Sequence, residues 1–304
     1  MDSLAKLIHL AQITGSINIL CQFKGEWFMH HPHKRAHGVI HFVTSGQGWL
    51  HIQNQPPQIL QTGDLIVLPR SAEHILSHDS HCSNPYAQPN LSTQGAFTLK
   101  NMDSDSHHTL TLFCANFDYE PHADLFNGLP EILHLNGKEP EFQHILSLLQ
   151  HEAQQNYPAA SMILNALLEI LLIHILRQYL NQQPILSGIL NGLHDKRLRG
   201  VLTAVLAEPA HDWTVEAMAE QAHLSRAQLM RLFKQYIEMS PHAFVNHIRL
   251  QAAAQMLRQT ADSILQIALS VGFQSETHFG KAFKKQYGIP PGIYRKQHPE
   301  SVNS

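Results

Sequence analysis

The spacing of hydrophobic positions divides the chain into a strand-rich part and a helical part. Residues 1–20 carry apolar side chains at helical spacing and are expected to form a short helix. From Cys21 to Phe117 the apolar runs are short and are bounded by Gly, Pro and Ser, which is typical of strands. From Pro140 onward apolar residues recur every three or four positions, which predicts helices. The expected fold class is therefore α+β.

The strand-rich part is expected to form a closed or layered β-structure. Ser45, Gly46 and Gln47 separate two apolar runs and give a hairpin signal. Many short strands with Gly and Pro between them predict a barrel or a sandwich. The polar, weakly periodic run 78–108 is expected to be a long mobile loop. The strand-like runs are residues 38–44, 48–52, 58–61, 63–69, 72–77 and 110–117.

Two helices are expected after the strands, at residues 140–152 and 159–181. The second has an apolar face too broad for one neighbour, so we expect it to pack partly on the strand-rich part and partly on a second subunit. Polar residues interrupt this helix, which argues against a membrane span. Residues 181–184 end it, and the polar run 186–194 is expected to be a hinge. Its apolar face consists of Leu164, Leu168, Leu171, Leu172 and Ile175.

Residues 213–294 contain two copies of one helical unit, about fifty residues apart. In each copy a short helix carries a small residue where a second helix must approach closely. A tight turn follows, at a residue that accepts left-handed backbone geometry, and then a serine placed to cap the next helix. The matched positions are Ala219 and Ala268, His223 and Gly272, Ser225 and Ser275, Leu229 and Phe279, Phe233 and Phe283, Pro241 and Pro291, and Phe244 and Tyr294.

Each copy has the pattern of a helix-turn-helix whose second helix, about residues 225–236 or 275–287, keeps one face polar. Such a helix fits the major groove of DNA with its N-terminal side chains at the base edges. A plain helical bundle with solvated polar faces is the alternative, and two copies in register make it the weaker one. The expected DNA contacts are Ser225, Arg226, Gln228, Arg231, Lys234, Gln274, Ser275, Glu276, Thr277, His278 and Lys281.

Three runs in this region resemble the signature of AraC/XylS-family transcription regulators. They are Ile-Ala-x-x-Val-Gly-Phe (267–273), Phe-x-x-x-Phe-Lys (279–284) and Gly-Ile-Pro-Pro-Gly-Ile-Tyr-Arg (288–295). The resemblance covers about a third of the chain. It implies two helix-turn-helix units joined by one long helix, here about 241–259, and a homodimer. We also expect double-stranded promoter DNA and RNA polymerase as partners.

The distribution of charge agrees with this division. Residues 196–298 contain 13 Lys and Arg against 7 Asp and Glu, a net charge of +6, whereas the remainder carries −9. A positive net charge in this region is expected of a protein that binds the phosphate backbone of a nucleic acid. No basic head with a long apolar run opens the chain, so no secretion signal is expected. The three cysteines form no CxxC pair and point to the cytoplasm, with nucleoid association when DNA is bound.

The run from Val39 to Leu76 resembles the cupin-type effector domain found ahead of many AraC-type DNA-binding domains. Gly46 and the motif Gly-Asp-x-x-x-x-Pro-x-x-x-x-His (63–74) carry the likeness. A strand places alternate residues inward. His41, His51 and His74 are therefore expected to converge inside the barrel.

These histidines have two interpretations. They are core polar groups or ligand-pocket residues, or they hold a divalent metal ion, for which His41 and His74 are the expected ligands. Metal-binding cupins usually supply a His-x-His pair and a Glu. Here His31-Pro-His33 precedes the first clear strand, and no suitably spaced Glu follows. This departure weighs against the rival function, a metal-dependent cupin enzyme. A divalent metal ion in the cupin pocket is therefore one alternative, and no other cofactor is expected.

The cysteines give a further resemblance. Residues 1–7, Cys21, His41 and Cys114 together resemble a branch of AraC-type activators that respond to reactive chlorine and related oxidants. The resemblance implies redox sensing through Cys21 and Cys114, and Cys82 in the polar loop does not fit it. The alternative is that both cysteines are small core hydrophobes, and that the signal is a carbohydrate or other small ligand.

The expected organisation has four parts. A cupin-like β-barrel sensing domain spans residues 1–137, and helices for linking and dimerisation span 138–190. An all-α DNA-binding domain with two helix-turn-helix units spans 191–298, followed by a tail at 299–304. The expected function is sequence-specific transcription regulation, most simply activation, and not catalysis. A structural interaction module is a weaker alternative.

Overall fold

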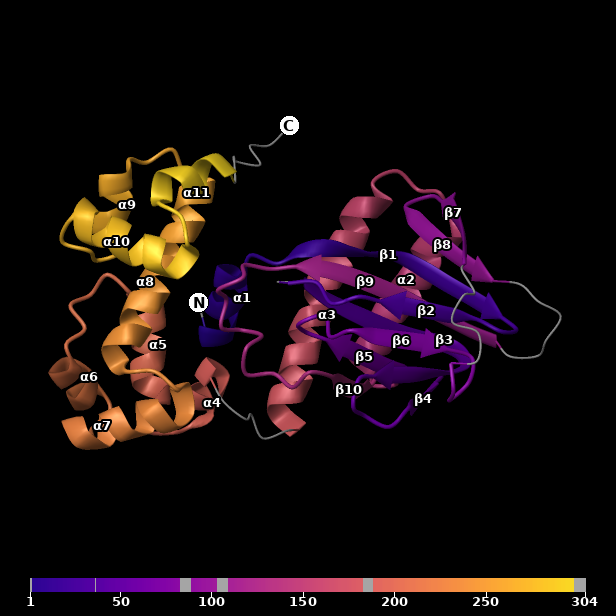
Figure 1. Cartoon of the computed structure of the whole chain (residues 1–304), viewed down its shortest axis with the longest axis horizontal. Helices are drawn as coiled ribbons and strands as arrows, with labels where there is room; N and C mark the ends of the chain where they lie inside the picture. The colour runs from indigo at the N-terminus through magenta and orange to yellow at the C-terminus, as the bar shows by residue number, and fades with distance from the viewer. Residues whose placement is uncertain (1, 36, 83–88, 103–108, 183–187, 298–304) are drawn as a thin grey trace. The chain divides into compact units, whose positions relative to one another are not determined.

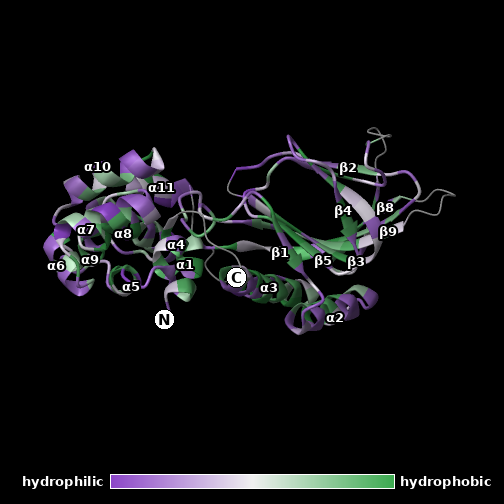
Figure 2. Ribbon diagram, turned by 90° about the horizontal axis from the view of Figure 1, so that it is seen from below, coloured by the Kyte–Doolittle hydropathy of each residue, from purple (hydrophilic) through white to green (hydrophobic). Residues whose placement is uncertain are grey.

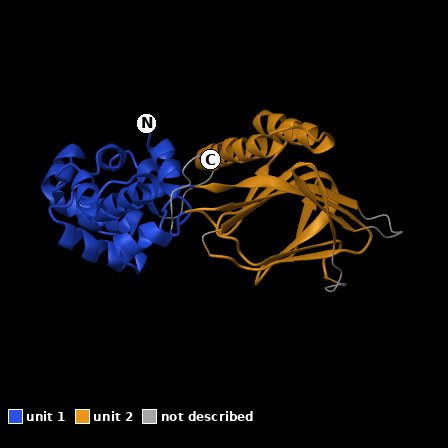
Figure 3. Ribbon diagram, turned by 90° about the horizontal axis from the view of Figure 1, so that it is seen from above, with its two compact units in different colours: residues 1–12, 120–128, 185–304 blue, residues 13–119, 129–184 orange. Residues whose placement is uncertain are grey.

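The structure, a computed structural model, forms two compact units (Figure 3). It describes residues 2–35, 37–82, 89–102, 109–182 and 188–297, so the expected tail lies outside the described residues. Unit 1 comprises residues 1–12, 120–128 and 185–304, and unit 2 comprises residues 13–119 and 129–184.

The division into units differs from the domain boundaries that the sequence suggests. Residues 1–12 and 120–128 were expected within the sensing domain, but both belong to the compact unit that contains the helix-turn-helix repeats. The chain therefore enters and leaves unit 1 more than once.

Unit 2 is a curled β-sheet, a half-barrel, with two helices on one face (Figures 1 and 2). Its main path runs β10–β5–β3–β9–β1–β8–β7, while β6 pairs with β2 and β3, and β4 pairs with β3. The expected cupin-like α+β architecture is confirmed. The strands are β1 (Thr14–Lys24), β2 (Phe28–His31), β3 (His37–Ile52), β4 (Gln58–Gln61), β5 (Asp64–Leu68), β6 (His74–Ser77), β7 (Asn90–Gln94), β8 (Phe97–Met102), β9 (Thr109–Asp118) and β10 (Leu133–Asn136).

The hairpin expected around Gly46 is wrong, because β3 is one continuous strand through these residues. Its first part pairs with β9 and β5, and its last part pairs with β4 and β6. Gly46 has a φ of +81°, and the register with β9 shifts between Val43 and Ser45. Such a bulge bends a strand and increases its twist. The bend explains how one strand pairs with β9 and β5 in its first part and with β4 and β6 in its last part.

Two other expectations are wrong, and a third, the hinge at 186–194, stays a prediction. Residues 14–20 belong to β1 and not to a helix, since Ile17, Ile19, Cys21 and Phe23 repeat every second position. The run expected as a loop at 78–108 contains the hairpin β7–β8, although 83–88 and 103–108 lie outside the described residues. The expected hinge contains the helix α4 (Gly188–His194).

The helices α2 (Pro140–Gln154) and α3 (Ala160–Gln182) confirm the periodicity prediction and pack together, with α3 against β1. α3 is long and apolar enough by composition to cross a membrane, contrary to the expectation. Its expected dimer face is also wrong, because these side chains are buried within unit 2. They are Leu164, Leu168, Leu171, Leu172 and Ile175, at 0–3% exposure.

Unit 1 is helical, and the long helix expected between the two helix-turn-helix units is confirmed as α8. Short helices precede and follow it in the order that the repeat predicts (Figure 1). Besides α4, the helices are α1 (Ser3–Ala11), α5 (Arg199–Ala207), α6 (Val215–Gln221), α7 (Arg226–Leu232), the π-helical turn η1 (Phe233–Ile237), α8 (Pro241–Gln259), α9 (Ile264–Ser270), α10 (Glu276–Tyr287) and α11 (Pro291–Gln297).

We predict that Gly46→Ala destabilises unit 2. An added Cβ would lie 2.0 Å from the carbonyl oxygen of Thr109, at a left-handed φ that only glycine adopts without cost. The expected loss is about 1–3 kcal/mol of unfolding free energy, measured by thermal and urea unfolding. The control is Gly200→Ala in α5, where a Cβ meets no atom within 4 Å. Equal stability of the two variants would contradict the role given to Gly46.

Candidate functional site

The two helix-turn-helix units of unit 1 repeat the same backbone hydrogen bond. In the first unit the N–H of Leu224 donates to the carbonyl of Ala219 at 2.9 Å. In the second unit the N–H of Phe273 donates to the carbonyl of Ala268, also at 2.9 Å. Both alanines are buried, so a second helix can approach closely. The internal repeat found in the sequence is thus a structural repeat.

The turn and capping residues of both units also match the prediction. His223 has a φ of +53° and Gly272 a φ of +97°, so both turns are left-handed. Ser225 precedes α7 and Ser275 precedes α10, and each side chain accepts a hydrogen bond from the backbone N–H three residues later. These caps satisfy backbone donors that the helix itself leaves free.

The side chains predicted to contact DNA are all exposed on unit 1. Two of them have partners within the chain. Arg226 lies 2.8 Å from Glu216, and the side-chain oxygen of Gln228 accepts from the N–H of Ser225 at 2.9 Å. The amide oxygen of Gln228 is thus engaged within the chain, and its NH₂ group is the donor with which it is predicted to contact DNA. The exposed set is Ser225, Arg226, Gln228, Arg231, Lys234, Gln274, Ser275, Glu276, Thr277, His278 and Lys281.

The segment 120–128 packs against α8 through a buried carboxylate that sequence reasoning missed. Glu120, at 3% exposure, accepts hydrogen bonds from Arg258 and from the hydroxyl of Tyr294, the latter at 2.8 Å. Its backbone N–H donates to the carbonyl of Ala11 at the end of α1. The partners lie 138 and 174 residues away along the chain, so no local pattern marks Glu120.

A second polar contact joins the same segment to α8. His247 Nε2 lies 2.8 Å from a carboxylate oxygen of Asp124. Burial lowers the pKa of His247, but the hydrogen bond and charge of Asp124 outweigh burial, so the net shift of the pKa is upward. α1 contributes a further contact, since the side-chain amide of Gln255 donates to His9 at 2.5 Å. Within unit 1, α8 therefore binds two segments that flank strands of unit 2 in the sequence.

Cys21 and Cys114 lie together in the core of unit 2. The antiparallel register pairs Ile19 with Cys114 and Cys21 with Leu112, so the cysteines are diagonal neighbours on one face of β1 and β9. Their sulfur atoms are 3.8 Å apart, and both thiols are free and buried. Cys82 has no part in this pair, because its sulfur lies 4.0 Å from the Ser77 hydroxyl.

A buried histidine lies beside the thiol pair. β3 runs next to β9, and the register places His41 directly opposite Cys114, with Nδ1 3.1 Å from the sulfur. Burial raises the pKa of Cys114 well above its usual value, and the Cys21 thiol adds to this shift. Burial also lowers the pKa of His41 well below its usual value. At neutral pH the thiol of Cys114 is therefore protonated and the imidazole is neutral.

The structure brings together two of the three histidines expected to converge. His41 Nε2 and His74 Nε2 are 2.9 Å apart, but His51 lies elsewhere and contacts the Ser77 hydroxyl at 2.7 Å. Strand alternation explains the difference: Ile52 pairs with His74 in the ladder, so the side chain before it points to the other face. The residue that joins His41 and His74 is instead His31, at the end of β2, which the sequence did not indicate.

Comparison with known proteins accounts for both units. A cupin family model matches residues 2–181, more than half of the chain, and a helix-turn-helix domain model matches residues 218–297. The chain is 46% identical to the HTH-type transcriptional regulator MtrA of Neisseria gonorrhoeae, over 98% of this chain and 99% of MtrA. The chain belongs to the AraC family of transcription regulators.

The chain is also similar to two further proteins. The chain is 29% identical to the RCS-specific HTH-type transcriptional activator RclR of Escherichia coli, over 98% of each chain. It is also similar to the DNA-binding domain of AdpA in complex with a target DNA, at 25% identity and a TM-score of 0.33, over 34% of this chain and 93% of that chain. As an AraC-family regulator the protein binds double-stranded DNA.

We predict that Arg231→Ala in α7 and Lys281→Ala in α10 weaken binding to the cognate promoter site. The loss of a DNA contact is expected to cost about 1–3 kcal/mol, or about 5- to 150-fold in Kd at constant salt. Titration of labelled promoter DNA measures it. Lys196→Ala is the control, since this lysine is exposed in the same unit but outside the recognition helices. If both variants bind as tightly as the control, the assignment of α7 and α10 is wrong.

Proposed function

We propose that this AraC-family protein is a transcription activator that switches when an oxidant joins Cys21 to Cys114. The observation that carries the proposal is the 3.8 Å separation of the two sulfur atoms. A disulfide needs about 2.0 Å, so a small displacement is enough. The similarity to an activator described as RCS-specific supports the same chemistry. The partners in this proposal are promoter DNA, RNA polymerase and a second copy of the chain.

The oxidation can be written with hypochlorous acid as the oxidant. One thiol is oxidised to a sulfenic acid while HCl is released, and the other thiol then attacks the sulfenic sulfur, so that the S–S bond forms and water leaves. Because burial raises the pKa of Cys114, the reaction needs a neighbouring proton acceptor. His41 Nδ1, 3.1 Å from the Cys114 sulfur, is in position to accept the proton.

The disulfide is expected to move β1 along β9, because the two cysteines are diagonal and not directly opposite. The ladder ends at Thr14 and Asp118. From there the chain continues directly into two segments of unit 1, namely residues 1–12 and 120–128. Both segments contact α8, which joins the two helix-turn-helix units. A displacement of β1 against β9 therefore passes along the chain to these two segments and, through their hydrogen bonds, to the helix that joins the two helix-turn-helix units.

We predict that Cys21→Ala and Cys114→Ala each abolish most of the response to hypochlorous acid and leave basal DNA binding unchanged. A single remaining thiol cannot form the intrachain bridge. The response is measured by transcription from the target promoter in vitro, and the bridge by the mass of the non-reduced chain. Cys82→Ala is the control and is expected to respond like the wild type.

One outcome would contradict this proposal. If a chain that lacks both Cys21 and Cys114 still responds fully to hypochlorous acid, the signal does not pass through the thiol pair. The sensing function would then belong to another group in the cupin unit, and the histidines would be the next candidates.

The proposal includes a homodimer formed through the exposed face of α3. Met162, Ile163 and Ile170 are 42–71% exposed there. We predict that Met162→Glu combined with Ile170→Glu makes the chain monomeric, because two charges would have to be buried at the interface. Light scattering at tens of micromolar measures the mass. Leu148→Glu on α2 is the control, since Leu148 is also exposed. A monomeric wild type would contradict the dimer.

A further inference from the structure

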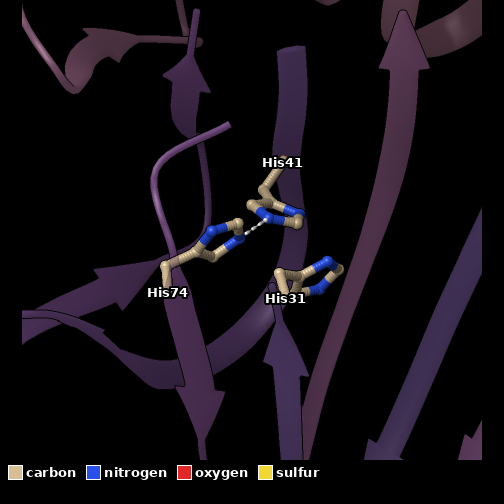
Figure 4. Close-up of side chains that lie close together, drawn as sticks. All are labelled: His31, His41 and His74. Carbon is tan, nitrogen blue, oxygen red and sulfur yellow. Dashed lines mark hydrogen bonds between the residues drawn. The ribbon is translucent and has the colours of Figure 1, made fainter. Parts of the chain in front are cut away.

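Three imidazoles from three strands of unit 2 face one another (Figure 4). His31 ends β2, His41 lies in β3 and His74 begins β6, and the β2–β6 ladder pairs His31 directly with His74. One ring nitrogen from each histidine lies within 4.8 Å of the other two. The rings of His31 and His74 are stacked at 4.5 Å, and His41 meets both edge-on. The cluster is therefore a product of strand pairing and not of one mobile loop.

The hydrogen bonds determine which nitrogen of His74 and which nitrogen of His41 holds a lone pair. His74 Nδ1 lies 2.7 Å from the carbonyl of Ala72, which can only accept, so Nδ1 donates and Nε2 of His74 is unprotonated. His41 Nε2 must then donate to it across the 2.9 Å contact. A histidine whose second nitrogen donates to a backbone carbonyl is oriented as metal-bound histidines usually are.

His31 supplies an independent observation. Its Nε2 is buried and has no hydrogen-bond partner among the residues that the structure describes. A buried polar atom without a partner is costly, and such atoms often indicate an ion or water that completes the site. A neutral imidazole has one ring nitrogen with a lone pair to donate to a metal ion.

We propose that His31, His41 and His74 form a binding site for one zinc-class divalent cation, with a fourth position open to water or a small anion. Three neutral imidazoles are a suitable ligand set for such an ion. Tetrahedral binding at zinc–nitrogen distances of about 2.0–2.1 Å places the nitrogens about 3.4 Å apart. The observed separations, 2.9 Å for one pair and at most 4.8 Å for all, require only small ring rotations.

The ligand set differs from the His-x-His and Glu pattern expected of metal-binding cupins. His33 is outside the cluster, since its Nδ1 lies 3.0 Å from the carbonyl of Ser71. The thiol of Cys114 faces Nδ1 of His41, the opposite edge of the ring from the cluster, so it is not the fourth ligand. When the cation binds Nε2 of His41, the hydrogen of that ring moves to Nδ1, so the proton transfer from Cys114 described above belongs to the chain without the cation. The site goes beyond the proposed function, because it does not require the thiols to react.

The test measures zinc and cobalt binding by the full chain under reducing conditions. The expected result is one zinc ion per chain, measured by equilibrium dialysis and elemental analysis. His31→Phe keeps a flat ring against His74 but removes the ligand, and it is expected to weaken binding by about 10- to 100-fold or more. His51→Ala is the control from the same unit and is expected to bind like the wild type. Circular dichroism verifies that both variants fold.

Cobalt(II) identifies the ligands by a second readout. Nitrogen ligands alone give weak visible bands, whereas thiolate ligands add an intense sulfur-to-cobalt charge-transfer band in the near ultraviolet. The site predicts no such band and unchanged binding in Cys21→Ala and Cys114→Ala. Absence of stoichiometric zinc, equal affinity in His31→Phe, or a thiolate band would each overturn the assignment. The oxidant response of the cysteine variants is measured separately, so failure of this site is distinguishable from failure of the redox proposal.

Discussion

The antiparallel pairing of β1 with β9 is the interaction on which the account of this protein depends. It places Cys21 diagonal to Cys114 in the core of unit 2, and the neighbouring strand β3 adds His41 to the same face. The ladder ends at Thr14 and Asp118, and beyond these residues the chain continues into the two segments that bind α8 in unit 1. In the proposed function, a disulfide between these cysteines acts on strands that continue into the DNA-binding unit.

Both units bury polar groups that hydrophobic side chains would replace at lower cost. In unit 2 a chain of polar contacts links the Ala72 carbonyl to His74, His74 to His41, and His41 to Cys114. In unit 1 the buried carboxylate of Glu120 requires both its arginine and its tyrosine partner. Buried polar networks are costly when partly satisfied. Their position beside the thiols and beside α8 is consistent with regulation and not with stability alone.

The sequence predicts those features whose signals are local. The helix-turn-helix repeat, its turns at His223 and Gly272 and its serine caps depend on residues a few positions apart, and all are confirmed. The bend of β3 was mistaken for a hairpin, because a glycine between apolar runs signals a turn and a bulge equally well. The pairing of distant strands has no local signal. It decides that His31 and not His51 joins His41 and His74. Glu120 likewise has no local signal, because its partners Arg258 and Tyr294 lie far away along the chain.

If the thiol pair controls the segments that hold α8, hydrogen exchange in these segments depends on whether the two thiols are bridged. Exchange of residues 3–11 and 120–128 is compared by mass spectrometry in the reduced chain and in the chain bridged between Cys21 and Cys114. We expect faster exchange in both segments of the bridged form, with a change in α8 as well. Identical exchange in the two forms, alongside an intact transcriptional response, would contradict it.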